Sequence, residues 1–283
     1  MKTKPISEPV IGSFDGRTIA FVRPRDKLDE SANLVSTAGG RPYPVDILTV
    51  RSLIHRPEVE SFFEELCTRG FDYSIFMSTN GVEHFVTAGE KYRPQHYREA
   101  LGRSKVIAVG PKTAQQLARQ ELPCHEIPDR YSSSGIIASM EVKDLSEARV
   151  AIPRARNASP SLREGLADLG AKVTEVFLYE LEVDSSSVKT MEFLRGISRG
   201  RIDAVVFTSS AIAQGVLGAA ETSSMREEVH RKLASNVLVV AIGPLTASTL
   251  REMGLRVVVE PRIHTFRGAV ASLTAQYQKS NEL

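Results

Sequence analysis

The chain has 283 residues, of which 42% are hydrophobic and 25% are charged. This composition excludes a disordered chain, and the length suggests two domains. The formal net charge of +2 is nearly balanced, so charge alone gives no argument for a nucleic-acid partner. No apolar run reaches the ~18 residues of a membrane span, residues 1–16 lack a signal-peptide core, and the two cysteines are far apart. We therefore expect a reduced, cytoplasmic protein.

Short apolar segments, mostly rich in branched or aromatic residues, predict buried parallel strands. In chain order they are Thr18–Val22, Tyr73–Met77, Val106–Val109, Val150–Ile152, Ala204–Phe207 and Val237–Ile242. Amphipathic helical patterns lie between them, as in Val59, Phe62, Phe63, Leu66 and Cys67, or in Leu162, Leu166 and Leu169. Gly70, Gly170 and Gly254 stand where such helices should end. The alternation predicts an α/β fold, with parallel sheets covered on both faces by helices.

The sequence also repeats itself at a nearly constant offset. The clearest match pairs Ile107–Leu117 with Val240–Leu250, which share the pattern Gly-Pro-x-Thr-Ala. Weaker matches in the same order pair Phe76 with Phe207, Ala20–Arg25 with Val150–Ala155, and Pro128 with Pro261. Any α/β protein repeats strand–turn–helix, but the Gly-Pro-x-Thr-Ala match is specific. We therefore predict an internal duplication.

Hydroxyl and amide side chains follow two of the predicted strands. Ser78, Thr79 and Asn80 follow the first of them, and Thr208 and Ser209 follow the second. These side chains could hydrogen-bond a carboxylate. They are also preferred N-cap residues, and both interpretations can hold at once, because an N-cap loop presents free backbone N–H groups.

The duplicated Gly-Pro-x-Thr segments contain Gly110 with Thr113, and Gly243 with Thr246. Glycine permits a tight exit from a strand, and proline suits the first helical turn. The backbone amides that follow would lie at a positive helix end, which suits an anion. The alternative is a simple strand–helix turn.

Arginines follow the strands that open each repeat, namely Arg23 with Arg25, and Arg154 with Arg156. The planar donor fork of arginine suits a carboxylate, although an exposed arginine is more often only solvated. Ser159-Pro160-Ser161 followed by Glu164 predicts a capped helix start that faces the same site.

Other chemistry has no motif in the sequence. Neither of the glycine-rich nucleotide-binding patterns is present, and no Gly-x-Ser-x-Gly nucleophile elbow occurs. The six histidines have no metal-ligand spacing with one another or with a cysteine. We therefore expect no metal site, no redox centre and no covalent nucleophile.

The ordered set of motifs Phe76–Val82, Ala108–Ala114, Phe207–Ser209 and Ala241–Ala247 resembles the uroporphyrinogen-III synthase family. Val-Arg-Pro at residues 22–24 and Tyr179 also fit, and the resemblance runs from about residue 18 to 273. It implies two similar flavodoxin-like parallel-sheet domains, joined by a two-stranded linker and facing a cleft. Carried onto this chain, the domains are 17–44 plus 184–283 and 52–172. The linker strands are then 45–51 and 173–183, and residues 1–16 form an N-terminal extension.

The resemblance further implies a cofactor-free lyase. Family members close hydroxymethylbilane, a linear tetrapyrrole with eight carboxylates, with loss of water and inversion of ring D, giving uroporphyrinogen III for haem and related tetrapyrroles. A monomer is implied, with transient hand-over of substrate from hydroxymethylbilane synthase and no nucleic-acid or membrane partner. Tyr179 matches a recurrent tyrosine that faces the cleft, where it is either a proton donor to the departing hydroxyl or a linker packing residue. The implied substrate-binding residues are Arg23, Ser78, Thr79, Asn80, Gly110, Thr113, Arg154, Ser161, Thr208, Ser209, Gly243 and Thr246.

Two other functions fit the same fold. One is a non-catalytic relative that senses a tetrapyrrole or another anion. The other is a two-domain anion-binding protein of the periplasmic type, which the lack of a signal peptide and of a disulfide pattern disfavours.

Overall fold

The structure, a computed structural model, describes residues 9–281. The chain divides into two compact units. Unit 1 comprises the residues up to 49 and those from 182 onward, and unit 2 comprises residues 50–181. Each unit is an α/β fold built around its own sheet.

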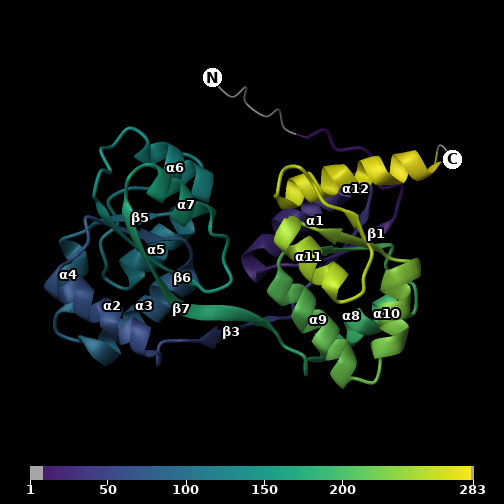
Figure 1. Cartoon of the computed structure of the whole chain (residues 1–283), viewed down its shortest axis with the longest axis horizontal. Coiled ribbons are helices and arrows are strands. Elements are labelled where there is room, and N and C mark those ends of the chain that lie inside the picture. Colours follow the sequence, from purple (N-terminus) through teal and green to yellow (C-terminus); the bar gives the residue numbers. More distant parts are fainter. Residues whose placement is uncertain (1–8, 282–283) are drawn as a thin grey trace. The chain divides into compact units, whose positions relative to one another are not determined.

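Unit 1 contains a parallel sheet with the strand order β10-β9-β8-β1-β2. The strands are β1 (Thr18–Val22), β2 (Arg41–Val45), β8 (Ala204–Phe207), β9 (Leu238–Ala241) and β10 (Val257–Val259). Helices α1 (Leu28–Thr37) and α12 (Phe266–Asn281) cover one face (Figure 1). The other face is covered by α8 (Val188–Ser198), α9 (Ser210–Thr222), α10 (Arg226–Ser235) and α11 (Pro244–Glu252). A short 3-10 helix, η1 (Arg25–Lys27), precedes α1.

Unit 2 contains a sheet with the order β3-β7-β6-β4-β5, in which the last four strands run parallel. The strands are β3 (Leu48–Ser52), β4 (Tyr73–Phe76), β5 (Lys105–Ala108), β6 (Arg149–Ala155) and β7 (Lys172–Val183). One face is covered by α2 (Pro57–Thr68), α3 (Thr79–Tyr92), α4 (Tyr97–Gly102) and α5 (Pro111–Arg119). The other is covered by α6 (Ser133–Met140) and α7 (Ser161–Asp168).

The predicted α/β architecture with parallel sheets is confirmed. All six predicted strands are present, and Gly70, Gly170 and Gly254 follow helices with the positive φ angles of 68°, 94° and 80° that favour glycine. Strand β2, with the sequence Arg-Pro-Tyr-Pro-Val, was not among the predicted strands; the predicted first linker strand, 45–51, instead covers the last residue of β2 and most of β3. Strand β2 lies at the edge of its sheet, where proline is tolerated because one side of the strand forms no ladder.

The two sheets share a strand order. The series β9-β8-β1-β2 of unit 1 corresponds to β5-β4-β6-β7 of unit 2. Even the short β10 has a counterpart, because Val259 pairs with Val240 in unit 1, and Glu126 forms a parallel bridge with Ile107 at the equivalent place in unit 2. This likeness is what a duplication would produce, and the duplication itself stays a prediction.

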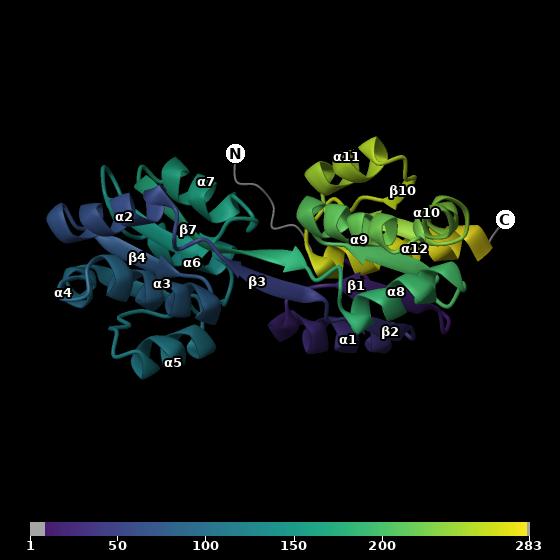
Figure 2. The ribbon, with the colours of Figure 1, turned by 90° about the horizontal axis from the view of Figure 1, so that it is seen from below.

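Strands β3 and β7 lie side by side, and the boundary between the two units falls within both of them (Figure 2). Strand β7 pairs with β6 from Lys172 to Tyr179. Most of the segment predicted as the second linker strand, 173–183, is therefore a regular strand of the unit 2 sheet. The role of these strands as a linker stays a prediction.

The predicted N-terminal extension, 1–16, is partly integrated into unit 1; residues 1–8 lie outside the described residues. Phe14 is fully buried and packs edge-on against Tyr277, with ring centroids 6.3 Å apart. Its backbone N–H donates to the Ala38 carbonyl at 2.8 Å. Gly40 is required beside it, because a Cβ there would lie 2.8 Å from the Phe14 ring. The core of unit 1 therefore begins before residue 17, the start expected from the sequence.

We predict that Phe14→Ala destabilises the protein by about 3–5 kcal/mol, because it leaves a cavity in a packed core. Urea denaturation followed by circular dichroism would measure the change. Val10→Ala is the matched control, since Val10 is 90% exposed and its loss should change stability by less than about 0.5 kcal/mol. Equal stability of the two variants would contradict the assignment of Phe14 to the core.

Candidate functional site

In unit 1, the predicted site residues follow three neighbouring parallel strands. Arg23 follows β1, Thr208 and Ser209 follow β8, and Gly243 and Thr246 follow β9. The strands run parallel, so these residues gather at one edge of the sheet. Thr208 ties two of the strand ends together, because its Oγ1 donates to the Val22 carbonyl at 3.0 Å.

Unit 2 gathers the other predicted residues in the same way. Ser78, Thr79 and Asn80 follow β4, Gly110 and Thr113 follow β5, Arg154 lies near the end of β6 with Ser161 beyond it, and Tyr179 lies on β7. These strands are also parallel neighbours. Each unit therefore has one sheet edge that carries the predicted residues.

Four of the helices that begin at these two edges follow β4, β5, β8 and β9, namely α3 and α5 in unit 2 and α9 and α11 in unit 1. Ser78 caps α3, its Oγ accepting from Gly81 N–H at 2.9 Å, and Ser209 caps α9 in the same way, accepting from Ile212 N–H at 3.2 Å. The N-cap interpretation of these serines is thereby confirmed. Helices α5 and α11 begin at Gly110 and Gly243, which provide no side-chain cap.

None of these four helices has an acidic residue in its first turn. Among the other described helices, α1, α2, α4, α7 and α10 have an acidic residue in the first turn, and α6, α8 and α12 have none. An acidic side chain at a helix N-terminus would compensate the positive end of the dipole and compete with an anionic ligand. The starts of α3, α5, α9 and α11 therefore keep their positive ends available, whereas those of α1 and α7, which follow β1 and β6 at the same two edges, carry acidic residues.

The most ordered part of the site is a hydroxyl pair in unit 2. The Tyr179 hydroxyl and Ser78 Oγ are 2.8 Å apart, and Tyr179 is only 4% exposed. The Tyr179 ring stacks on His84 at a centroid distance of 5.0 Å. His84 is oriented in turn by its Nδ1, which donates to the Asn80 carbonyl at 2.9 Å.

A glycine allows this cluster to form. A Cβ at Gly81 would lie 3.2 Å from the Pro153 carbonyl oxygen of β6 and 3.2 Å from Ser78 Oγ. The first turn of α3 therefore lies tightly against β6, the strand between β4 and β7. His84 was not among the predicted site residues, since no spacing in the sequence indicates that it meets a tyrosine so much later in the chain.

Arg23 was expected either to bind a carboxylate or to be solvated, and the structure shows it held by other side chains. Arg23 is half-buried, its Nη1 donates to Ser31 Oγ at 2.6 Å, and its guanidinium lies 4.9 Å from the centroid of the Phe266 ring. Burial lowers the pKa of Arg23, although Glu30 and Asp26 act in the opposite direction. Arg23 is therefore held in place at the sheet edge rather than freely solvated.

Arg154 is an internal ion-pair residue. It is 5% exposed, its Nη1 lies 2.6 Å from Glu175 Oε1, and its Nη2 donates to the Ser159 carbonyl at 2.6 Å. A guanidinium committed in this way cannot form a bidentate pair with a ligand carboxylate. We therefore leave Arg154 out of the substrate contacts proposed below.

The helix start at Ser161 also differs from the prediction. Pro160 occupies the N-cap position of α7, and its helix has no side-chain cap. Proline has no side-chain acceptor, so it cannot cap the helix itself. The hydroxyl of the preceding residue, Ser159 Oγ, accepts instead from Ser161 N–H at 3.3 Å. Ser161 itself is exposed, whereas Thr113 and Thr246 are buried at 3% and 5% exposure.

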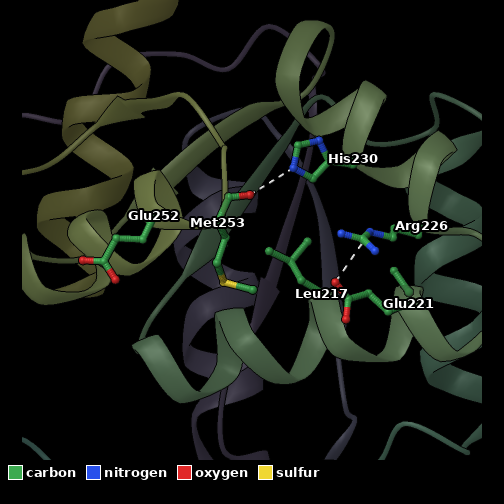
Figure 3. A pocket seen from close by; sticks show the side chains of 7 residues that line it. Leu217, Glu221, Arg226, His230, Glu252 and Met253 are labelled. Carbon is green, nitrogen blue, oxygen red and sulfur yellow. Dashed lines mark hydrogen bonds and ion pairs between the residues drawn. The ribbon is translucent and has the colours of Figure 1, made fainter.

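A separate pocket of about 250 Å³ lies in unit 1, away from these sheet edges (Figure 3). It is lined by the end of α9, by α10 and by the end of α11, with Leu217, Ala220, Glu221, Arg226, His230, Glu252 and Met253. Helices α9 and α11 follow parallel strands, so their C-terminal ends lie beside the amino ends of the strands, opposite the edge that carries the predicted residues. The pocket contains none of the predicted residues, and it is smaller than the ~300–1,000 Å³ usual for ligand sites.

A family model described as "Uroporphyrinogen-III synthase HemD" matches residues 29–271 of the chain. The chain belongs to the uroporphyrinogen-III synthase family. The matched range covers every predicted site residue except Arg23, which precedes it. The members of this family are enzymes of tetrapyrrole biosynthesis.

Individual relatives agree with the family. The chain is 28% identical over 257 residues to a Methanothermobacter thermautotrophicus protein named "Putative uroporphyrinogen-III synthase", covering 90% of this chain and 96% of that one. It is 25% identical over 192 residues to the uroporphyrinogen-III synthase of Chlorobaculum parvum, covering 66% and 72%. A crystal structure of a mutant Thermus thermophilus uroporphyrinogen III synthase is similar in fold, with a TM-score of 0.50 at 20% identity, over 93% of this chain and all of that one.

Between residues 9 and 281, none of the helices combines the length and apolar character needed to cross a bilayer. The same part of the chain contains no cluster of three or more His, Cys, Asp or Glu side chains suited to hold a metal ion.

We predict that Arg154→Met lowers the free energy of unfolding by about 3 kcal/mol, because it leaves Glu175 nearly buried without its closest partner. Arg163, 3.6 Å from the other Glu175 oxygen, is about half exposed and compensates little. The double variant Arg154→Met/Glu175→Gln should recover most of the loss in urea denaturation. A double variant as unstable as Arg154→Met would show that the ion pair is not the cause.

Proposed function

We propose that this chain is a uroporphyrinogen-III synthase. It closes hydroxymethylbilane into uroporphyrinogen III, with loss of water and inversion of ring D. Family membership over residues 29–271 supports the proposal. The substrate carries eight carboxylates, so an enzyme for it needs many anion-binding groups and few acidic ones.

The observation that carries the proposal is the set of four helix starts without acidic residues in their first turns. Backbone amides at a helix N-terminus bind carboxylates through their N–H groups and through the positive end of the dipole. The same helix starts occur in both units, at sheet edges built in the same way. We propose that both sets bind carboxylates of the substrate.

Individual residues then have specific roles in binding. Ser78, Thr79 and Asn80 would act at the start of α3, and Thr208 and Ser209 at the start of α9. Gly110 with Thr113, and Gly243 with Thr246, would present backbone amides of α5 and α11. Arg23, which follows β1, and Ser161, at the start of α7, would contact substrate at the same two sheet edges. Because much of this binding uses backbone groups, single side-chain substitutions should have mild effects.

Selectivity is the main task of such an enzyme. A pyrrole nitrogen can expel the hydroxyl of the bilane unaided, and the free bilane then closes without inversion. An enzyme must hold the chain folded so that closure through the spiro intermediate is faster. Effective molarities of ~10⁵–10⁸ M for well-oriented intramolecular reactions show that positioning alone can supply a large part of the rate.

We propose that Tyr179 donates the proton to the departing hydroxyl. The 2.8 Å contact with Ser78 Oγ and the stacking on His84 hold the phenol in one orientation. Ser78 is itself fixed, because its Oγ accepts from the Gly81 amide. A fixed donor avoids reorganisation when the bond to the hydroxyl breaks.

Delivery of the substrate follows from its chemistry. Free hydroxymethylbilane closes spontaneously to the wrong isomer, so we propose transient hand-over from hydroxymethylbilane synthase. We propose that the chain acts as a monomer.

We predict that the protein increases formation of the type III isomer in a coupled assay. Hydroxymethylbilane is generated in place by its synthase, the protein is added, and the oxidised products are separated by chromatography. Type III product in proportion to the added protein is expected. Only type I product, from protein shown to be folded by circular dichroism, would favour the sensor alternative.

We predict that Tyr179→Phe lowers kcat for type III formation at least about 100-fold, since general acids contribute roughly 10²–10⁴-fold. KM should change little, because the ring still stacks on His84. Loss of one buried hydrogen bond should cost only about 1 kcal/mol of stability. Tyr92→Phe is the matched control, since its hydroxyl donates to the Ile54 carbonyl elsewhere in unit 2. Full activity in Tyr179→Phe would exclude the proton-donor role.

A further inference from the structure

Two loops, one in each unit, have the same hydrogen-bonding pattern. In residues 130–136 of unit 2, Ser132 N–H donates to the Arg130 carbonyl, and Ser132 Oγ accepts from Gly135 N–H at 3.1 Å. In residues 263–269 of unit 1, Thr265 N–H donates to the Ile263 carbonyl, and Thr265 Oγ1 accepts from Gly268 N–H at 3.0 Å. The two loops therefore place their residues in equivalent positions.

Each loop lays one ring against the glycine that starts a neighbouring helix. A Cβ on Gly110 would lie 3.1 Å from Tyr131 Cγ, and a Cβ on Gly243 would lie 3.3 Å from His264 Cγ. Both rings are nonetheless exposed, Tyr131 by 60%. A ring packed for stability would be buried, whereas these two residues are exposed to solvent beside the helix starts that the proposed function uses.

In both units the first turn of the helix beside the ring of the loop carries an exposed side chain, and the pair of residue types differs between the units. Two residues after Gly110 stands Lys112, which is exposed, and two residues after Gly243 stands Leu245, which is 76% exposed. Unit 2 thus combines an aromatic ring on the loop with a cation on the helix. Unit 1 combines an imidazole on the loop, which can carry positive charge, with an apolar side chain on the helix.

A carboxylated pyrrole needs both kinds of group. Its flat ring is apolar and stacks on aromatic or aliphatic side chains, and its carboxylates pair with cations and backbone amides. We propose that Tyr131 with Lys112, and Leu245 with His264, each bind one carboxylate-bearing pyrrole ring of the substrate. The ring lies on Tyr131 or Leu245, and a carboxylate pairs with Lys112 or His264. This inference rests on the proposed function, and it adds residues that determine how the tetrapyrrole is held.

The first test removes a ring. Tyr131→Ala should raise KM for type III formation about tenfold, the size of loss seen when a stacking aromatic side chain is removed. It should weaken binding of uroporphyrin III, the oxidised octacarboxylate macrocycle, by a similar factor in a fluorescence titration. Tyr131→Phe, which keeps the ring, should lose less than about threefold in both measurements. Because Tyr131 is exposed, both variants should fold, which thermal denaturation would verify.

The second test replaces the residue pair of unit 1, His264 and Leu245, with the residue types of the unit 2 pair. His264→Tyr removes the imidazole that we propose to pair with a carboxylate in unit 1 and should raise KM and the uroporphyrin III Kd about five- to tenfold. His264→Tyr/Leu245→Lys gives unit 1 the same pair as unit 2 and should return both values to within about threefold of wild type. His96→Tyr and Val142→Lys are matched controls, because both positions are exposed and lie outside the site.

The outcomes separate this inference from the proposed function. Wild-type activity with unchanged KM and Kd in Tyr131→Ala and His264→Tyr would overturn the inference and leave the proposed function intact. Uroporphyrin III binding that weakens in these variants, without type III formation by the wild type, would support the inference and overturn the enzymatic proposal. A wild-type protein that neither forms type III product nor binds uroporphyrin III would overturn both.

Discussion

The parallel direction of the strands is the constraint on which the candidate site depends. When neighbouring strands run parallel, every turn from strand to helix falls at the same edge of the sheet. The N-termini of α3, α5, α9 and α11 are brought to such edges, and their unpaired amides and dipoles place four positive helix ends there. Helix C-termini gather at the opposite edge, where in unit 1 the 250 Å³ pocket lies. The electrostatic character of the two edges of a sheet therefore follows from topology, before any charged side chain is considered.

In unit 2, the close packing of α3 against β6 accompanies a contact between two hydroxyl groups at this edge. Ser78 follows β4 and Tyr179 lies on β7, and β6 separates the two strands. Their hydroxyls meet at 2.8 Å, and Gly81 lets the first turn of α3 lie against the Pro153 carbonyl. A Cβ at position 81 would lie 3.2 Å from that carbonyl oxygen and from Ser78 Oγ, so one of them would have to shift. The glycine thus favours the close approach of α3 to β6 on which the contact with Tyr179 depends.

The strands, the parallel α/β architecture and the helix starts could be predicted from the sequence, because these features depend on local patterns. Buried strands are apolar runs, and Ser78, Ser209, Gly110 and Gly243 begin helices for reasons of backbone chemistry. Contacts between distant segments could not be predicted in this way. Arg154 has the appearance of a ligand-binding arginine until Glu175 is found beside it, and the stacking of His84 on Tyr179 depends on how α3 packs against the sheet. The buried position of Phe14 likewise depends on Tyr277, at the other end of the chain.

The two units share a backbone plan but differ in the chemistry that they carry. Strand pairing aligns them residue by residue, because Thr18 pairs with Arg41 in unit 1 as Arg149 pairs with Lys172 in unit 2. In that alignment Ser78 corresponds to Ser209, which caps its helix in the same way. Tyr179 lies beyond the aligned pairs, after the register shift at Arg154/Ala155, on a part of β7 that has no counterpart in β2. The helix starts that we propose to bind carboxylate thus occur in both units, and the proposed acid, Tyr179, lies in unit 2. This division suits the proposed reaction, since a substrate with eight carboxylates needs repeated anion sites but loses a single hydroxyl. Two units of similar fold can thus share the proposed binding groups, while one of the units supplies the proposed acid.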